Sequence, residues 1–154
     1  MSFPEFQRCI YAEAPAMGAC MEAFNQWMEE AGLPETVRLA LALAVDELLA
    51  NILSHAYRQD RDRQLSISAR CAACVVELTL GDDGPFFDPT QAPQPDLCVP
   101  LEQRHAGGLG LWLVRHAVDH VSYRRFDNRN ELTLRKSWGD ASDAVVEHGE
   151  IVPH

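Results

Sequence analysis

The stretch AVDELLANILSHAY, residues 44–57, carries Glu47, Asn51 and His55 at steps of four within an otherwise apolar run. Residues four apart lie one above the other on a helix, so these three form a single polar stripe. The residues around the stripe are apolar: Leu43, Leu48, Leu49, Ile52 and Leu53. A solvent-facing stripe would carry more charge, and we therefore expect this one to face a cavity.

The stretch lies in the second of two helices predicted on either side of a Gly-Leu-Pro break. Residues 16–32 repeat apolar side chains at helical spacing, after Pro15 at a position that a first helical turn tolerates. Gly32 ends this helix, and Pro34 opens the longer one, which we expect to continue through residue 57.

The rest of the pattern predicts strands and one further helix. Strands are expected at residues 6–14, 64–71, 74–82, 121–126 and 131–138, with the turn-rich DNRN (127–130) between the last two. Helical spacing returns in residues 108–121. This order predicts an α+β two-layer sandwich, in which three helices cover one face of a mixed, mostly antiparallel sheet.

Length and charge limit the classes of function. The 154 residues predict one domain with a sizeable core, residues 1–138, followed by an acidic tail, residues 139–154, that we expect to be flexible or to dock on a partner. The formal net charge of -10 disfavours direct binding to nucleic acid or to an anionic membrane and suits protein partners. No apolar run approaches the roughly 20 residues of a membrane span.

The cysteines are five and scattered, unlike a disulfide framework. Together with the absence of a signal-peptide pattern, they favour a reducing cytoplasm. Cys71 and Cys74 form a lone CAAC between two predicted strands. A second ligand pair at zinc spacing is missing, so a hairpin turn is favoured over a metal or redox site.

A second polar cluster, LGDDGPFFDP (80–89), follows a predicted strand. Asp82 could accept a hydrogen bond from an exocyclic amine, and Gly84 allows the backbone to turn or to approach a ligand closely. Taken alone, the cluster is better explained as a plain acidic turn. The residues between it and Gly107 contain several prolines and little periodicity, which is typical of a lid, a binding loop or a disordered segment.

A third cluster, HAGGLGLWLV (105–114), places Gly107, Gly108 and Gly110 directly before or at the start of a helix. Such an arrangement exposes backbone amides and the positive end of the helix dipole, which suit a phosphate. It lacks the Lys-Ser/Thr of a Walker loop and the β-α-β context of a dinucleotide fingerprint. A flexible helix entry is the alternative interpretation.

The order of the three clusters resembles the ATP-binding domain of the GHKL superfamily. The closer resemblance is to its anti-sigma factor serine/threonine protein kinases, over residues 6–136. AVDELLANILSHAY is similar to their N box, DDGPFFDP to their first glycine box, and GGLGLWLVRHAVDHVSY to their second.

The resemblance implies a GHKL (Bergerat) ATP-binding fold that uses ATP and Mg²⁺. It implies Glu47 as the general base, Asn51 as the magnesium ligand and Asp82 as the adenine contact, while Gly84 lets the purine approach. The polar stripe of Glu47, Asn51 and His55 would then face Mg-ATP. His55 belongs to the same box, and we interpret it as a structural hydrogen-bonding residue.

The phosphate end of the site is implied in the same way. Gly108 and Gly110, with Leu111 beside them, would bind the nucleotide, and Arg104 could meet phosphate charge or be a solvated lid residue. Phe86 stands where the superfamily has a second glycine. Asp46 adds a carboxylate beside Glu47, but neighbouring residues point about 100° apart on a helix, so we expect Asp46 to lie to the side.

The implied activity is phosphorylation of a serine or threonine of an anti-anti-sigma (STAS-domain) antagonist, with a sigma factor as the second partner and a homodimer as the assembly. Two alternatives stay open. One is a catalytically silent module that binds a sigma factor or another regulator, and the other is a switch kinase that acts on a scaffold protein.

Other enzyme classes fit less well. The sequence HAVDH places His116 and His120 four apart, but Ala117 stands where a zincin needs glutamate directly after its first histidine. The G-x-S-x-G of a serine hydrolase is missing.

Overall fold

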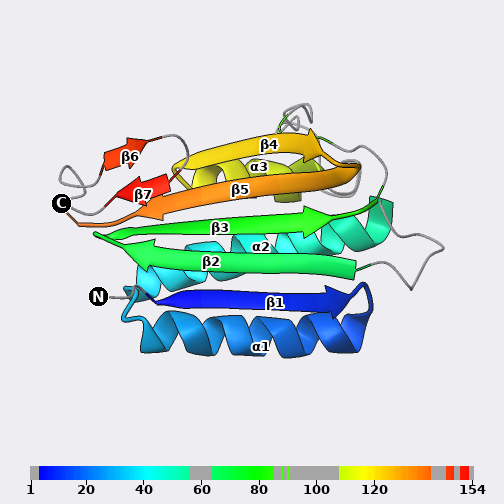
Figure 1. Ribbon diagram of the computed structural model, residues 1–154. Helices are drawn as coiled ribbons and strands as arrows, with labels where there is room; N and C mark the ends of the chain where they lie inside the picture. Colours follow the sequence, from blue (N-terminus) through cyan, green and yellow to red (C-terminus); the bar gives the residue numbers. More distant parts are fainter. Residues whose placement is uncertain are drawn as a thin grey trace.

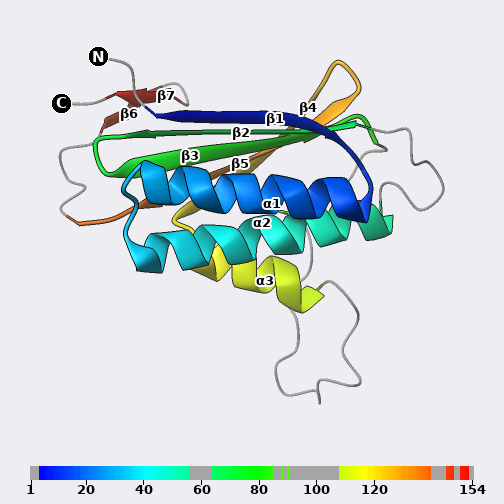
Figure 2. The same ribbon diagram turned by 90° about the horizontal axis from the view of Figure 1, so that it is seen from below.

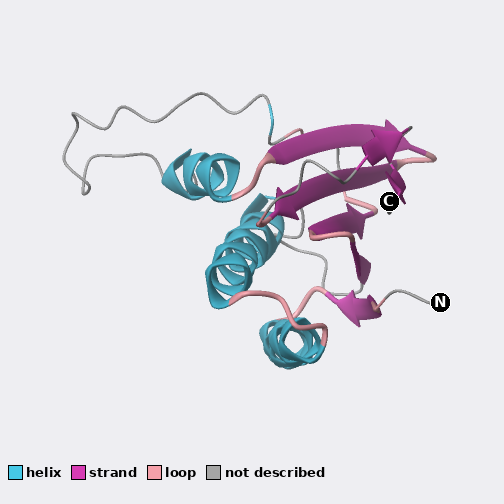
Figure 3. Ribbon diagram, turned by 90° about the vertical axis from the view of Figure 1, so that its left-hand side faces the viewer, coloured by secondary structure: helices cyan, strands magenta, loops and turns pink. Residues whose placement is uncertain are grey.

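The computed structural model describes residues 4–55, 64–84, 88, 90, 108–139, 145–147 and 150–152. Its elements are β1 (Glu5–Tyr11), α1 (Ala14–Glu30), α2 (Glu35–His55), β2 (Gln64–Ala72), β3 (Val75–Asp82), α3 (Gly108–Ala117), β4 (His120–Phe126), β5 (Arg129–Ser137), β6 (Val145–Glu147) and β7 (Glu150–Val152) (Figure 1). The three helices cover one face of the large sheet, and no helix of the described residues lies on its other face (Figure 3).

The large sheet has five strands in the order β1-β2-β3-β5-β4. Every pairing in it is antiparallel. After β3 the chain passes through α3, forms β4 at the sheet edge and returns as β5 beside β3. The predicted α+β sandwich with three helices on one face is confirmed.

The strand register sets three cross-strand rows on the face that the helices cover. Leu78, Leu134 and Val121 form one row, and Leu80, Leu132 and Tyr123 form the next. Asp82, Asn130 and Arg125 form the third row, at the end of β3. Because side chains alternate along a strand, all three rows face the helices.

Helix α1 ends through a Schellman motif. Gly32 has a φ of +77°, its N–H donates to the Glu29 carbonyl at 3.0 Å, and the Leu33 N–H donates to the Met28 carbonyl at 3.1 Å. Leu33 is 4% exposed. The glycine predicted to end this helix therefore does so, because the left-handed conformation there carries no Cβ penalty.

Helix α2 lies between α1 and α3 and carries the stripe identified in the sequence (Figure 2). Steps of four residues cover 400° of a helix, so such a row winds by about 40° per step. Leu39 is 64% exposed and Leu43 is 40% exposed, whereas Glu47 is half-buried and Asn51 is 8% exposed. Leu43, one of the apolar residues around the stripe, therefore faces outward.

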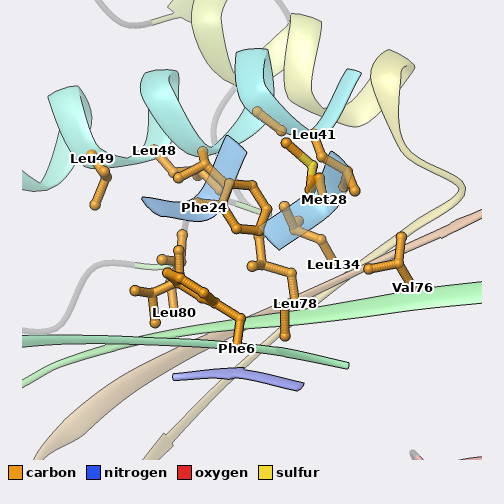
Figure 4. Close-up of a cluster of buried hydrophobic side chains, with 14 of the residues drawn as sticks. Phe6, Phe24, Met28, Leu41, Leu48, Leu49, Val76, Leu78, Leu80 and Leu134 are labelled. Carbon is orange, nitrogen blue, oxygen red and sulfur yellow. The ribbon is translucent and has the colours of Figure 1, made fainter. Parts of the chain in front are cut away.

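The core lies between the helix layer and the sheet. Figure 4 shows side chains of α1 and α2 directed toward those of the sheet, among them Phe6, Phe24, Met28, Leu41, Leu48, Leu78, Leu80 and Leu134. The rings of Phe6 and Phe24 lie 5.5 Å apart in a tilted arrangement. Burial of this apolar surface supplies most of the stabilisation of such a fold.

Several boundaries differ from the sequence prediction. Helix α3 ends at Ala117 and β4 begins at His120, where the pattern predicted a helix through residue 121. His116 and His120 therefore lie on different elements. The turn between β4 and β5 is only Asp127 and Asn128, both at positive φ (51° and 59°), so the last two residues of DNRN belong to β5.

The tail contains β6 and β7, a short antiparallel pair that the weak pattern did not reveal. The expectation that residues 139–154 form a flexible tail stays a prediction. Residues 56–63 lie outside the described part of the chain. Most of the expected lid, residues 86–107, also lies outside it, apart from positions 88 and 90.

Candidate functional site

Four elements bring polar groups to one end of the molecule. Strand β3 ends there, β5 begins there, the C-terminal half of α2 reaches it and α3 starts beside it (Figures 1 and 2). Antiparallel pairing of β3 with β5 is the reason that the last residue of one strand meets an early residue of the other. The polar stripe of α2 and the end of β3, which are the first two sequence clusters, therefore lie near the start of α3, which belongs to the third.

Asp82 lies at the centre of this end, with only 6% of its surface exposed. Its Oδ1 accepts a hydrogen bond from the Gly84 N–H at 2.9 Å and another from Asn130 Nδ2 at 3.0 Å. Among the described residues, none donates to Oδ2. A buried carboxylate with one occupied and one available oxygen is suited to read a donor on a ligand.

Asn130 is the partner that the sequence analysis missed, because it was assigned to a turn. It is 5% exposed, and its Oδ1 accepts from Tyr123 Oη at 2.6 Å and from Arg125 at 2.9 Å. Counting back by two from Leu134 and Leu132 would have placed it on the inner face of β5. The signal was therefore present in the alternation of that strand.

A narrow cavity opens beside this network. Its lining residues come from α2, β3, β4 and β5: Leu48, Asn51, Ile52, Leu80, Asp82, Tyr123, Asn130 and Leu132. Apolar side chains dominate, and the polar groups are the carboxylate, the two amides and the Tyr123 hydroxyl. A flat heterocycle with a hydrogen-bond donor at its edge fits this combination.

Asn51 and Asp82, two of the predicted site residues, line the cavity together. Glu47 lies one turn earlier on α2, half-buried, and is not among the described lining residues. Asp46 is exposed and lines a different groove, between α1 and α2. Its predicted position to the side of the stripe is confirmed.

The glycine cluster forms the start of α3. Gly108 is the first residue of the helix, and Gly110 and Leu111 complete its first turn. Backbone N–H groups in a first turn have no intrahelical acceptor, so they remain available to an anion. Arg104, Gly107 and Phe86 lie outside the described residues, as does the side chain of His55.

The segment after the first glycine box is tied to α3. Asp88 Oδ1 accepts from the N–H of Thr90 at 2.9 Å and from its hydroxyl at 2.6 Å. Arg115 of α3 donates to the Thr90 carbonyl. These contacts fix where the chain leaves the site end of β3.

The CAAC sequence forms the β2–β3 hairpin turn, as predicted. Ala73 and Cys74 have φ values of 51° and 62°, and Cys71 and Cys74 are both free thiols. Burial, and secondarily the nearby Cys74, raises the pKa of the Cys71 thiol above its ordinary value. A raised pKa leaves less of the thiolate that redox and metal chemistry require.

The profile of the histidine kinase-like ATPase domain matches residues 10–136. The match covers most of the chain, and the five-stranded antiparallel sheet with its three helices agrees with it. The chain therefore belongs to the histidine kinase-like ATPase domain family. The resemblance stated from the three motifs is confirmed at this level.

Two curated relatives narrow the comparison. The chain is 38% identical over 112 residues to the serine/threonine-protein kinase BtrW of Bordetella bronchiseptica, across 70% of this chain and 79% of that protein. It is 32% identical over 99 residues to the serine-protein kinase RsbW of Bacillus subtilis, across 61% of this chain and 59% of that protein. Both relatives are named as protein kinases.

A solved structure supports the fold. The crystal structure of the RsbU and RsbW domains of Rv1364c from Mycobacterium tuberculosis aligns with a TM-score of 0.60 and 15% identity. The alignment covers 87% of this chain and 32% of that one. At this identity the likeness concerns the fold alone.

The described helices include none that is both long and apolar enough to cross a membrane. A cytoplasmic location stays a prediction.

Proposed function

We propose that this chain is a protein kinase that binds Mg-ATP in the cavity beside Asp82 and phosphorylates a serine or threonine of an anti-anti-sigma antagonist with a STAS domain. When the antagonist is phosphorylated, the kinase holds a sigma factor. Family membership and the printed names of the two relatives support the kinase class.

One observation carries the proposal. A buried carboxylate, Asp82, and a buried amide, Asn51, line the same narrow apolar cavity, and the first turn of α3 begins at the same end of the molecule. Adenine needs an acceptor for its exocyclic amine and apolar walls for its ring. The phosphates need backbone donors, which a helix N-terminus offers.

Asn51 fits a magnesium ligand on the chemistry of its side chain. Its amide is 8% exposed and borders the cavity, and no described residue forms a hydrogen bond with it. An amide oxygen is a hard ligand that suits Mg²⁺, which keeps waters and phosphate oxygens as its other ligands. Bound there, the ion would neutralise charge on the phosphates.

The proposed step is transfer of the γ-phosphoryl group to a hydroxyl. The serine or threonine oxygen forms a bond to the γ-phosphorus while the bond from that phosphorus to the bridging oxygen breaks, and ADP leaves. Glu47 accepts the hydroxyl proton. Positioning and charge stabilisation supply most of the rate in such reactions, so the carboxylate acts mainly at the nucleophile.

Binding is tested by calorimetry with ATP and ADP. We expect Asp82→Asn to lose most of the affinity, because an amide in place of the carboxylate presents a weaker acceptor and can present a donor. Gly110→Ala should weaken binding as well, since a methyl group would stand where the proposed phosphates approach the backbone. Parent-like affinity in both variants would contradict the proposed position of the nucleotide.

Transfer is tested with [γ-³²P]ATP and a purified STAS-domain antagonist encoded in the same genome. The expected result is a phosphorylated antagonist and release of the sigma factor only by the unphosphorylated form. Stable capture of a sigma factor with no phosphate transfer would favour the silent binding module. Transfer to a scaffold protein in preference to the antagonist would favour the switch kinase.

A further inference from the structure

We propose that Asn130, held in one orientation by Tyr123 and Arg125, positions Asp82 to read the nucleotide base and so sets the preference for adenine over guanine. This inference rests on the proposed function and adds a positioning residue, with two residues that lock it.

The two ends of the Asn130 side chain have opposite partners. Its Oδ1 receives hydrogen bonds from Tyr123 and Arg125, and its Nδ2 donates to Asp82 at 3.0 Å. A guanidinium can only donate. Turning the amide over would set an NH₂ group against Arg125 and an oxygen against the Asp82 carboxylate, so Arg125 allows one orientation.

The hydrogen-bond network around Asn130 extends to the turn after β3. Arg125 also donates to the Gly84 carbonyl at 3.1 Å, while the Gly84 N–H donates to Asp82. Both backbone groups of Gly84 are thereby tied to the same network. Asp82 cannot rotate without breaking hydrogen bonds to two different elements.

The register explains why these groups meet. Asp82 pairs directly with Asn130 across β3 and β5, and Asn130 pairs directly with Arg125 across β5 and β4. Directly opposite residues on an antiparallel pair have Cβ atoms about 4.5–5.5 Å apart. The network is therefore built into the sheet instead of depending on a loop.

The consequence for the base follows from the charge of the carboxylate. Among the described residues, Gly84 and Asn130 donate to Asp82 Oδ1 and none donates to Oδ2. A fixed, acceptor-only oxygen pairs with the 6-amino group of adenine. The same position in guanine is a carbonyl oxygen, which would face the carboxylate without a proton between them and lose affinity.

The test measures the ratio of the dissociation constants for Mg-GTP and Mg-ATP instead of a single affinity. Loss of a residue with a purely structural role would weaken the binding of both nucleotides equally and leave this ratio unchanged. Calorimetry with the full chain gives dissociation constants for Mg-ATP and Mg-GTP. For the parent we expect a preference for ATP of at least about tenfold, the lower range for an unmatched buried acceptor.

Asn130→Asp is the informative variant, since it keeps the acceptors for Tyr123 and Arg125 but places a second acceptor against Asp82. Two carboxylates in contact cannot both stay ionised, so the pair takes up a proton from solvent. When that proton is on Asp82 Oδ2, this oxygen becomes able to donate to the guanine carbonyl. We expect the preference for Mg-ATP over Mg-GTP to disappear, so that the ratio of the two dissociation constants is about one. Tyr123→Phe removes one of the two donors that orient Asn130. It should lower the preference for Mg-ATP by only about threefold, less than Asn130→Asp does.

Ser122→Ala is the matched control, on the same strand as Tyr123 but exposed on the other face. It should leave both dissociation constants unchanged. If Asn130→Asp does not fold, Tyr123→Phe alone decides the matter. A parent-like ratio in every folded variant would overturn the positioning role while ATP binding stands, whereas a parent that binds neither nucleotide would overturn the proposed function as well.

Discussion

Two rows of the same sheet, on the same face and four residues apart along β3, behave in opposite ways. The row of Leu78, Leu134 and Val121 packs under the helices, and Leu78 and Leu134 have no exposed surface. The row of Asp82, Asn130 and Arg125 satisfies its polar groups with one another instead.

The difference shows that the candidate site continues the inward-facing rows of the core, with polar side chains in place of apolar ones. Asp82 and Asn130 are nearly as buried as the leucines, at 6% and 5% exposed. Buried polar groups are costly unless they are paired, and here each pairs across strands. The apolar row therefore packs against the helices, whereas the polar row places buried hydrogen-bonding groups at the wall of a cavity.

The largest expected effect is a loss of chemistry without a loss of fold. A general base contributes about 10²- to 10⁴-fold in rate, or about 3–5 kcal/mol of barrier. Glu47→Ala should remove that factor from phosphate transfer while ATP affinity and the thermal midpoint stay near the parent values. Transfer assays and calorimetry on one preparation measure both. Full activity in this variant would contradict Glu47 as the base.

The apolar row should respond in the reverse manner. Leu134→Ala deletes a fully buried side chain between the layers, and such changes cost about 2–5 kcal/mol of unfolding free energy. Below its transition the folded variant should bind ATP within about threefold of the parent, because Leu134 lies two positions from Leu132 and does not line the cavity. Denaturant titration gives the first quantity. Thr133→Ala, on the opposite face, is the control and should cost much less.

A smaller effect is expected where the site meets the metal. Asn51→Ala removes the proposed magnesium ligand, so Mg-ATP affinity should fall by on the order of tenfold, about 1.4 kcal/mol. Affinity measured in EDTA should change much less. Equal losses with and without Mg²⁺ would mean that Asn51 contacts the nucleotide itself.

The smallest effect lies away from both rows, at Asp119. Partial burial acts to raise the pKa of its carboxyl, but hydrogen bonds from Ser137 and the nearby Lys136 outweigh it and hold the pKa below the ordinary value. A lowered native pKa stabilises the fold above the unfolded value near pH 4, and this contribution is lost as the pH falls through the native pKa.

Relative to Asp119→Ala, the parent should therefore be more stable at pH 6 by less than about 1 kcal/mol, since the group is largely exposed. The difference should shrink below pH 4. Chemical denaturation of both proteins at pH 6 and pH 3.5 measures it, and a difference that grows on acidification would contradict the assigned direction.

Much of this architecture could be predicted from periodicity. The alternation in β2 and β3 and the glycine and proline between α1 and α2 identified those elements, since each signal is local. The α3 boundary failed because Val118 continues the helical spacing after the helix has ended at Ala117. A buried apolar residue just after a helix has the same spacing in the sequence as one inside the helix, so periodicity alone does not locate the end of the helix.

The candidate site was predictable only in part, for a different reason. Asp82 and Asn51 stood out as polar residues in apolar surroundings, and both line the cavity. Asn130 did not, because asparagine next to Arg129 in a turn-rich segment suggests a turn. Its role depends on which strand lies beside β3, and the sequence of either strand alone does not contain that information.

The pairing of β3 with β5 also has a kinetic consequence. The hydrogen bond from Asn130 to Asp82 spans 48 positions of the chain, whereas β2–β3 and β4–β5 are joined by two-residue turns. Closing a long loop is entropically costly, so we expect both hairpins to form early and to dock late. The row of Asp82, Asn130 and Arg125 forms only after docking. If ATP binds there as proposed, it should slow unfolding in stopped-flow experiments and leave the early hairpin phase unchanged. Nucleotide occupancy would then report that the chain has finished folding.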